Sequence, residues 1–185
     1  MSVVNRELSN WLDTGRQPTI TLARLRDGGG TAGLMALNAM MLTSPSHLLL
    51  TQNRLPMADE GEKLFASLPA GAGRQDKFLF CAWQQQRLVG CIELIRRWPA
   101  RDVAYIGILQ VREAQLRLGH GTQILEIASH IARGWRGVRR LRLAVAANNL
   151  GAIAFWRHVG FQETGQRELR SDFTAPLIVM ERSLI

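Results

Sequence analysis

The stretch Val111-Arg-Glu-Ala-Gln-Leu-Arg-Leu-Gly119-His-Gly121 decides the fold. β-forming residues precede it and an amphipathic segment follows it, so we expect a strand that ends at Val111, a short loop, and a helix opened by the two glycines. Gly119 and Gly121 let the backbone approach a ligand closely. The first-turn N–H groups of a helix lack intrahelical partners and favour an anion such as a pyrophosphate. A tight turn without a ligand would use the same glycines, so both interpretations stay open at this point.

Two common phosphate-binding motifs are excluded by the same stretch. No Gly-Lys-Ser/Thr sequence follows it, so it is not a P-loop. Ile124 stands where a dinucleotide-binding fingerprint has its third glycine.

The remaining elements are predicted from hydrophobic periodicity and turn residues. We expect strands at 19–26, 78–83, 88–95, 104–111, 141–145, 161–168 and 175–184. We expect helices at 31–41, 56–68, 119–133 and 149–159, and a short helix over 5–13 in an N-terminal extension of residues 1–17. This order predicts one α/β (α+β) domain over residues 1–185, built around one mixed sheet.

Composition and cysteine usage indicate an ordinary soluble domain. Of the 185 residues, 46% are hydrophobic and 21% charged, and no apolar run reaches the length of a membrane span. Residues 1–14 lack the apolar core of a secretory signal, so we expect a cytoplasmic protein with no membrane partner. Cys81 and Cys91 lie in apolar runs without metal-ligand spacing, which predicts reduced, buried thiols. No pair of histidines has the spacing of a metal site, so we expect no metal.

The net charge of +8 favours an anionic partner, either a phosphate-rich cofactor or nucleic acid. One local cluster holds Arg133, Arg136, Arg139, Arg140 and Arg142. Charge clusters are usually solvated faces, and aromatic residues do not alternate with these arginines as in single-strand readers, so we do not expect nucleic acid as the partner.

A second segment, Asn149-x-x-Ala152-x-x-x-Trp156-x-x-x-Gly160-Phe161, lies one strand further on. Taken with the first segment, it resembles the GNAT acetyltransferase family. That family carries V-x-P-x-x-Q/R-x-x-G-x-G/A after its fourth strand and N-x-x-A-x-x-x-Y-x-x-x-G-F across its fourth helix. The resemblance runs from about residue 19 to the C-terminus. It implies a mostly antiparallel central sheet of about seven strands flanked by about four helices.

The resemblance implies acetyl-CoA as co-substrate, lying between the strands at 104–111 and 140–146. Its pantetheine arm would pair with the backbone of Leu109, Gln110 and Val111, and Asn149 would contact the arm. Phe155 and Trp156 would flank the thiol end. The pyrophosphate would lie on the backbone amides of Leu116, Arg117, Leu118, Gly119, His120, Gly121 and Thr122. We expect His120 to be exposed or near the phosphates rather than catalytic.

Three positions depart from the family pattern. Leu116 replaces Gln/Arg, although Arg117 is adjacent, and Glu113 replaces Pro. Trp156 stands where the family often has a Tyr that acts as general acid. Because an indole N–H is not a useful acid at neutral pH, the leaving thiolate would take its proton from water or another group, or need none in the slow step.

The mechanism we expect is direct attack of a neutral amine on the thioester carbonyl, which a backbone N–H near 109–111 would polarise. Glu93 is the first candidate base, because a carboxylate inside the apolar run 88–95 needs an explanation. An edge-strand Glu facing solvent, or one paired with an Arg, is the alternative. Tyr105 is the second catalytic candidate, and Glu113 and Asp172 are weaker ones. Cys91 as a nucleophile is set against core packing, which we favour.

The predicted function is transfer of an acetyl group to a primary amine of an unidentified small-molecule or protein acceptor. The alternatives are a non-catalytic acyl-CoA sensor and an acyltransferase acting on an RNA-linked or protein amine. Residues 31–76 would wall the acceptor cleft. Asp59, Glu60 and Glu62 there would attract a cationic amine or form an exposed helix face. Dimers are common in the family, so a homodimer is possible.

Overall fold

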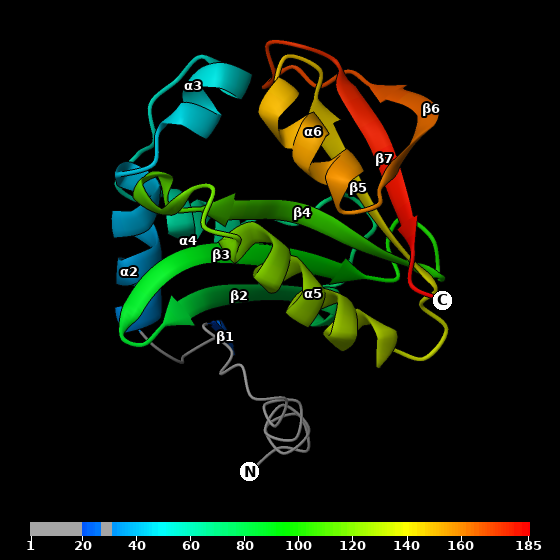
Figure 1. Ribbon diagram of the computed structural model, residues 1–185, viewed down its shortest axis with the longest axis horizontal. Helices are drawn as coiled ribbons and strands as arrows, with labels where there is room; N and C mark the ends of the chain where they lie inside the picture. The colour runs from blue at the N-terminus through cyan, green and yellow to red at the C-terminus, as the bar shows by residue number, and fades with distance from the viewer. Residues whose placement is uncertain (1–19, 27–30) are drawn as a thin grey trace.

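The computed structural model describes residues 20–26 and 31–185, and the helix predicted at 5–13 lies outside them. Within these described residues, seven strands form one sheet in the order β1-β2-β3-β4-β5-β7-β6 (Figure 1). Every neighbouring pair is antiparallel except β4 and β5, which are parallel. The strands are β1 Thr21–Arg24, β2 Lys77–Gln84, β3 Arg87–Arg96, β4 Val103–Val111, β5 Arg140–Ala146, β6 Gln162–Glu168 and β7 Leu177–Ser183.

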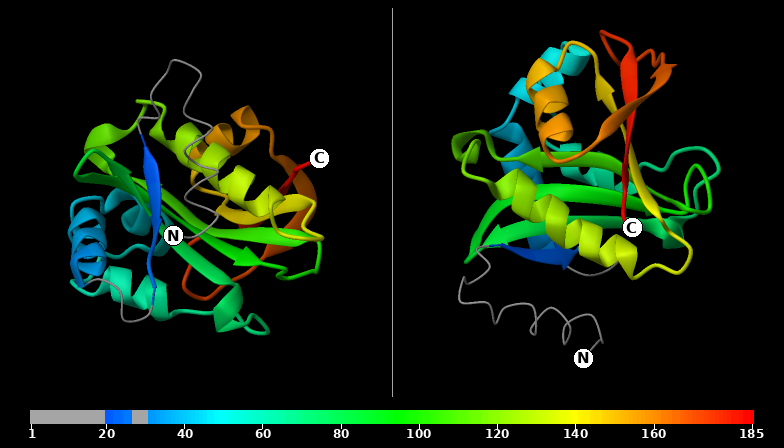
Figure 2. Two further views of the ribbon diagram at one scale, coloured as in Figure 1. Left: turned by 90° about the horizontal axis from the view of Figure 1, so that it is seen from below. Right: turned by 45° about the vertical axis from the view of Figure 1, so that its right-hand side comes forward.

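Helices cover both faces of the sheet (Figure 2). The described part of the chain contains the α-helices α2 Thr31–Leu42, α3 Ser46–Gln52, α4 Glu60–Ala66, α5 His120–Arg133 and α6 Leu150–His158, with short 3-10 helices η1 Arg74–Asp76 and η2 Glu113–Gln115. Side chains of α5 and α6 join one buried cluster, and those of α2 and α4 pack in another. Because β2 and β3 are covered on both faces, their sequences are almost continuously apolar.

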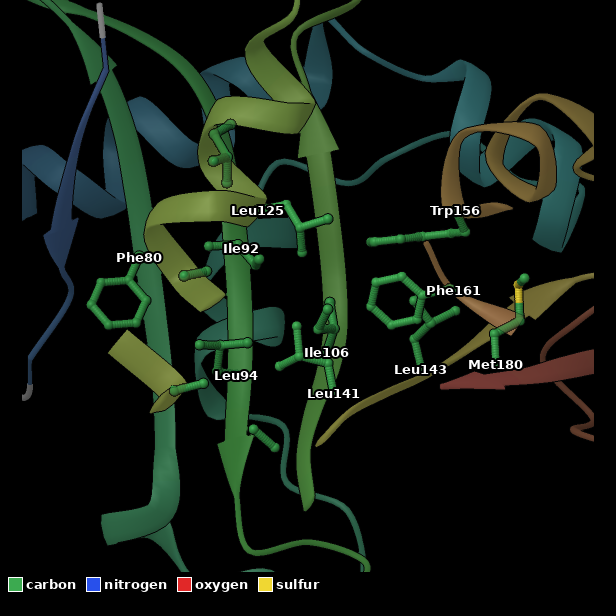
Figure 3. Close-up of a cluster of buried hydrophobic side chains, with 14 of the residues drawn as sticks. Phe80, Ile92, Leu94, Ile106, Leu125, Leu141, Leu143, Trp156, Phe161 and Met180 are labelled. Carbon is green, nitrogen blue, oxygen red and sulfur yellow. The ribbon is translucent and has the colours of Figure 1, made fainter. Parts of the chain in front are cut away.

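The larger core cluster joins α5 and α6 to the sheet (Figure 3). Leu125 of α5 packs over Ile92 and Ile106, and Trp156 of α6 packs beside Phe161. The expected periodicity of α5 is confirmed, since Ile124, Ala128 and Ala132 are fully buried along one face of that helix.

The predicted strands are all present, with ends shifted by a few residues. The helix predicted at 56–68 is shorter and begins at Glu60. Helix α3 was not predicted. It has seven residues and no side-chain cap at its N-terminus, so sequence alone gives little signal for it.

Three hydrogen bonds from other elements hold α3 in place. Ser46 N, at the first residue of α3, donates to Glu113 Oε1 at 2.6 Å. Asn148 Nδ2 donates to Leu50 O at 2.8 Å, and Thr174 N donates to Thr51 O at 2.8 Å. Helix α3 is therefore stabilised by tertiary contacts at both of its ends. Within residues 20–26 and 31–185, no helix has both the length and the apolar character needed to cross a bilayer.

Candidate functional site

Strands β4 and β5 pair over only part of their lengths. The parallel pairing runs from Val103 and Arg140 to Ile106 and Leu143 and then stops. Beyond it, β4 continues to Val111 paired with β3 alone, and β5 continues to Ala146 paired with β7 alone. Figure 1 shows the two strands running apart. The edge of β4 that faces β5 over residues 107–111 therefore has no strand partner in the described structure, and an extended ligand can pair with it.

At the open end of this gap, β4 leads through η2 into α5. Arg117 has φ +63° and Gly119 has φ +79°, so the chain turns twice through the left-handed region before the helix begins. A Cβ on Gly119 would meet nothing within 4 Å, so glycine is needed there for its backbone conformation rather than for space. The first-turn N–H groups of α5 have no partner within the helix, and groups of this kind favour an anion.

Gly121 differs from Gly119, because it lies against α6. A Cβ on Gly121 would be 3.4 Å from Cε2 and Cζ of Phe155 and 3.8 Å from Cδ2 of Leu109. Phe155, Gly121 and Leu109 thus bring α6, α5 and β4 together at the mouth of the gap.

The other residues predicted for the cofactor surround the same loop with different exposure. Leu116 and Leu118 are 54% and 62% exposed, and Arg117 and Thr122 are exposed as well. Gln110 is buried and its Nε2 donates to Ser44 O at 3.2 Å.

His120 was expected to be exposed or near the phosphates, and the first of these alternatives is wrong. The side chain is 5% exposed, and its Nδ1 has no hydrogen-bond partner in the described structure.

Two residues on α6 have structural contacts of their own. Asn149 is the N-cap, since its Oδ1 accepts a hydrogen bond from Ala152 N at 3.1 Å. Trp156 is 7% exposed and its ring lies 5.0 Å from that of Phe155 and 5.1 Å from that of Phe161 (Figure 3). The indole of Trp156 is therefore a core side chain. A packing role does not require an acidic group, and the indole has none that is useful at neutral pH.

Glu93 is buried, with 5% exposure, and it does not face solvent. Its partner is a lysine rather than an arginine: Lys77 Nζ lies 2.6 Å from Glu93 Oε2 as an ion pair, without hydrogen-bond alignment. Burial raises the pKa of the Glu93 carboxyl above its ordinary value, and the neighbouring Lys77 opposes that rise. A Cβ on Gly107 would lie 2.2 Å from Glu93 Oε1, so the carboxylate lies directly beside this glycine.

The other candidates for proton transfer are less suited. Burial raises the pKa of Tyr105 to about 12, so its phenol stays neutral, and its ring packs edge-on against Trp98 at 4.8 Å. The Glu113 carboxylate accepts the hydrogen bond from Ser46 that anchors α3. Asp172 forms an ion pair with Arg170 at 3.0 Å.

The cysteines are core residues, as favoured from the sequence. Cys81 and Cys91 are opposite each other on β2 and β3, both are buried, and both are free thiols. Burial raises the pKa of Cys81 to about 11 and that of Cys91 further, so neither is an activated nucleophile. The described residues contain no group of three or more His, Cys, Asp or Glu side chains that would hold a metal ion.

The unpaired edge of β4 and the glycine-opened start of α5 follow each other in the chain, and this arrangement suits an extended ligand that carries a phosphate group. The sequence profile of the acetyltransferase (GNAT) family matches residues 46–161, and the chain belongs to that family. The protein is accordingly an N-acetyltransferase that uses acetyl-CoA as co-substrate. A comparison with curated protein sequences gives no match.

Solved structures share the fold at low sequence identity. An acetyltransferase from Thermus thermophilus is 24% identical over 89% of this chain and 97% of its own, with a TM-score of 0.66. The ribosomal-protein-S18-alanine N-acetyltransferase from Escherichia coli is 20% identical over 89% and 94%, with a TM-score of 0.61. A GNAT acetyltransferase from Elizabethkingia anophelis with acetyl-CoA bound is 15% identical over 90% and 99%, with a TM-score of 0.59.

The two residues that lie against the Glu93 carboxylate, Lys77 and Gly107, were not identified from the sequence. A glycine inside a strand often marks a bulge or a close approach, and Gly107 carried that signal. Lys77 gave none, because a lysine at the start of a strand is usually exposed.

Proposed function

We propose that the protein transfers the acetyl group of acetyl-CoA to a primary amine by direct attack, without an acyl-enzyme intermediate. The observation that carries this is the separation of β4 from β5 after Ile106, where the buried carboxylate of Glu93 lies beside Gly107. The buried, unactivated thiols of Cys81 and Cys91 support the absence of a covalent step.

The cofactor would bind along the unpaired edge of β4. Its pantetheine arm would pair with the backbone of Leu109, Gln110 and Val111, and its pyrophosphate would lie on the amides of residues 116–122. These assignments are supported by the missing strand partner of β4 and by the backbone turn at Gly119. Asn149 would contact the arm through its Nδ2 group, since Oδ1 is occupied by the helix cap. Phe155 would line the same channel, since its ring lies at the opening of α5.

Glu93 is the proton acceptor in this proposal. An ammonium group gives one proton to the Glu93 carboxylate and becomes a neutral amine. The amine nitrogen then forms a bond to the thioester carbon, and the C–S bond breaks with its electron pair leaving on sulfur. The second nitrogen proton goes to solvent or to the CoA thiolate, so the products are an amide and free CoA. A backbone N–H of residues 107–111 would polarise the carbonyl.

The acceptor is a small-molecule or protein amine in this proposal, and two of the three acidic residues at the start of α4, Asp59 and Glu60, already have cationic partners. Glu60 is buried and its carboxylate pairs with both Arg54 Nη groups, at 2.6 and 2.8 Å. Asp59 pairs with Lys63 at 2.9 Å. The expectation that these side chains form either a cation-attracting cluster or a plain exposed face is therefore wrong for Glu60.

An RNA-linked acceptor is less well supported. Two arginines of the basic cluster, Arg140 and Arg142, pair with Glu181 at 2.9 and 2.8 Å, and Arg140 also pairs with Asp102 at 3.1 Å. These ion pairs reduce the charge that a phosphate backbone would meet.

The test is an acceptor screen. The purified protein is incubated with acetyl-CoA and a panel of amino acids, polyamines, aminoglycosides and peptides, and both free CoA thiol and N-acetylated product are measured. We expect one class to give stoichiometric thiol release and amide formation. Tight acetyl-CoA binding with no acetylated product from any class would contradict the proposal and favour the sensor.

A further inference from the structure

Three features of the fold meet at Gly107. It is the first residue of β4 beyond the last pair with β5, Ile106 and Leu143. It is also the extra residue of a bulge, because Glu93 pairs with Ile108 while Leu94 pairs with Ile106. The backbone at Gly107 is exposed, although the strand residues before it are largely buried.

Glycine is required at this position for space rather than for backbone conformation. The φ angle of Gly107 is outside the left-handed region. A Cβ there would lie 2.2 Å from Oε1 and 3.0 Å from Cδ of Glu93, closer than van der Waals contact allows. The carboxylate thus fills the space beside an exposed glycine, and any larger residue would cover Oε1 or displace it.

The Glu93 carboxylate is held from the other side by Lys77. Both side chains are buried, with exposures of 5% and 6%. Lys77 Nζ donates to Leu64 O at 2.6 Å and to Ser67 O at the C-terminal end of α4, and it pairs with Glu93 Oε2 at 2.6 Å. The acceptors on Leu64 and Ser67 hold the ammonium group in place, and its charge attracts Oε2, so that Oε1 faces Gly107.

We propose that Gly107 is the port through which the acceptor amine reaches Glu93 Oε1, and that Lys77 is the positioning residue for that carboxylate. Because Glu93 Oε1 lies directly beside the backbone of Gly107, we expect an unbranched primary amine to reach it more readily than an amine whose nitrogen is attached to a branched carbon. This inference rests on the proposed direct attack, because β4 loses its pairing with β5 at Gly107.

A purely structural ion pair is the competing explanation, and it predicts that small amines do not reach the carboxylate. The first experiment needs no turnover: the protein is labelled with ¹³C at the glutamate carboxyl, and ethylammonium chloride is titrated against the Glu93 resonance by NMR. We expect a saturable shift in the wild type, little shift in Gly107→Ala, and little shift with tert-butylammonium in either protein. A Glu93 resonance that ignores ethylammonium in the wild type would overturn the proposal.

The control for Gly107→Ala is Gly73→Ala, where a Cβ would meet the Gln75 side-chain amide at the same 2.2 Å, away from β4. Circular dichroism establishes that both variants fold. Gly73→Ala should keep the ethylammonium shift, and its loss there as well would show that the effect of Gly107→Ala is not local.

The second experiment addresses Lys77 through pH dependence, with the amine found in the acceptor screen. The charged or titratable groups that act on Glu93 are Lys77 of β2, Arg74 of η1 and Cys91 of β3. Lys77→Gln removes the cation and can still donate to the α4 carbonyls, so the acid limb of the kcat profile should move to higher pH. Glu93→Gln should lower kcat by about 10²-fold or more.

If the acid limb of the kcat profile does not move in Lys77→Gln, Lys77 is not a positioning residue for Glu93. Both variants should bind acetyl-CoA like the wild type by calorimetry. A wild type that binds no acetyl-CoA would instead defeat the proposed function, while the ethylammonium result would still decide whether the port exists.

Discussion

The phenyl ring of Phe155 lies 3.4 Å from the point that a Cβ atom on Gly121 would occupy. This contact joins the start of α5 to α6 beside Leu109 of β4. The side chain of residue 121 therefore limits how closely the two helices approach.

Enlarging residue 121 should separate the helices. In Gly121→Leu the added atoms overlap the Phe155 ring, and we expect a loss of about 1–3 kcal/mol in the free energy of unfolding, measured by urea denaturation. Gly121→Ala, whose Cβ only reaches contact distance, should cost much less. The double variant Gly121→Leu/Phe155→Ala should recover part of the loss, and strictly additive effects would contradict the contact.

At Gly119 the backbone conformation, rather than the space available, should decide the cost of a substitution. With φ at +79° and open space around it, Gly119→Ala should cost about 1–2 kcal/mol through backbone strain alone. Gly119→Asn should cost less, because asparagine tolerates the left-handed region. If Gly119→Ala and Gly119→Asn lose equal stability in thermal denaturation, the loss does not come from the backbone conformation of residue 119.

Helix α3 should become less stable when the hydrogen bonds that anchor it are removed. Glu113→Ala removes the acceptor for Ser46 N, and Asn148→Ala removes the donor to Leu50 O. We expect each to cost about 0.5–1.5 kcal/mol and to speed amide exchange in residues 46–52. Glu113→Gln is the matched control, since its amide oxygen can accept the same bond. If amide exchange in residues 46–52 is unchanged in both alanine variants, α3 is stable without these hydrogen bonds.

The cysteine thiols should react slowly with Ellman's reagent in the folded protein. With the pKa of Cys81 at about 11 and that of Cys91 higher, the thiolate fraction at pH 8 is about two orders of magnitude below that of a free thiol. The reaction should accelerate as the pH rises towards 11. Fast modification at pH 8 without unfolding would contradict the buried arrangement on β2 and β3.

Local patterns were sufficient to predict the strands, α5 and α6. Their residues repeat with clear periods, and Gly119 and Gly160 mark positions where the chain turns through positive φ. Helix α3 was missed because its stability comes from Glu113, Asn148 and Thr174, which are distant in sequence. Contacts of that kind leave no local signal.

The site was predictable where backbone groups form it and less so where side chains meet. The backbone turn at Gly119 and the start of α5, where the anion site is predicted, followed from a strand, a turn and a helix in sequence. Glu93 was selected because a carboxylate interrupts an apolar run, but its partner Lys77 and its neighbour Gly107 depend on strand register. His120 was expected to be exposed or near the phosphates, and its side chain is buried in the first turn of α5.

The most direct test of the account is acetyl-CoA binding by isothermal titration calorimetry to the wild type, Gly119→Trp and Gly137→Trp. Gly137 is the matched control, since it also has positive φ and no neighbour within 4 Å but lies after α5, outside the channel. We predict micromolar binding to the wild type and to Gly137→Trp, and none to Gly119→Trp. Absence of binding to the wild type at millimolar acetyl-CoA, or equal affinity in all three proteins, would contradict the site between β4 and β5.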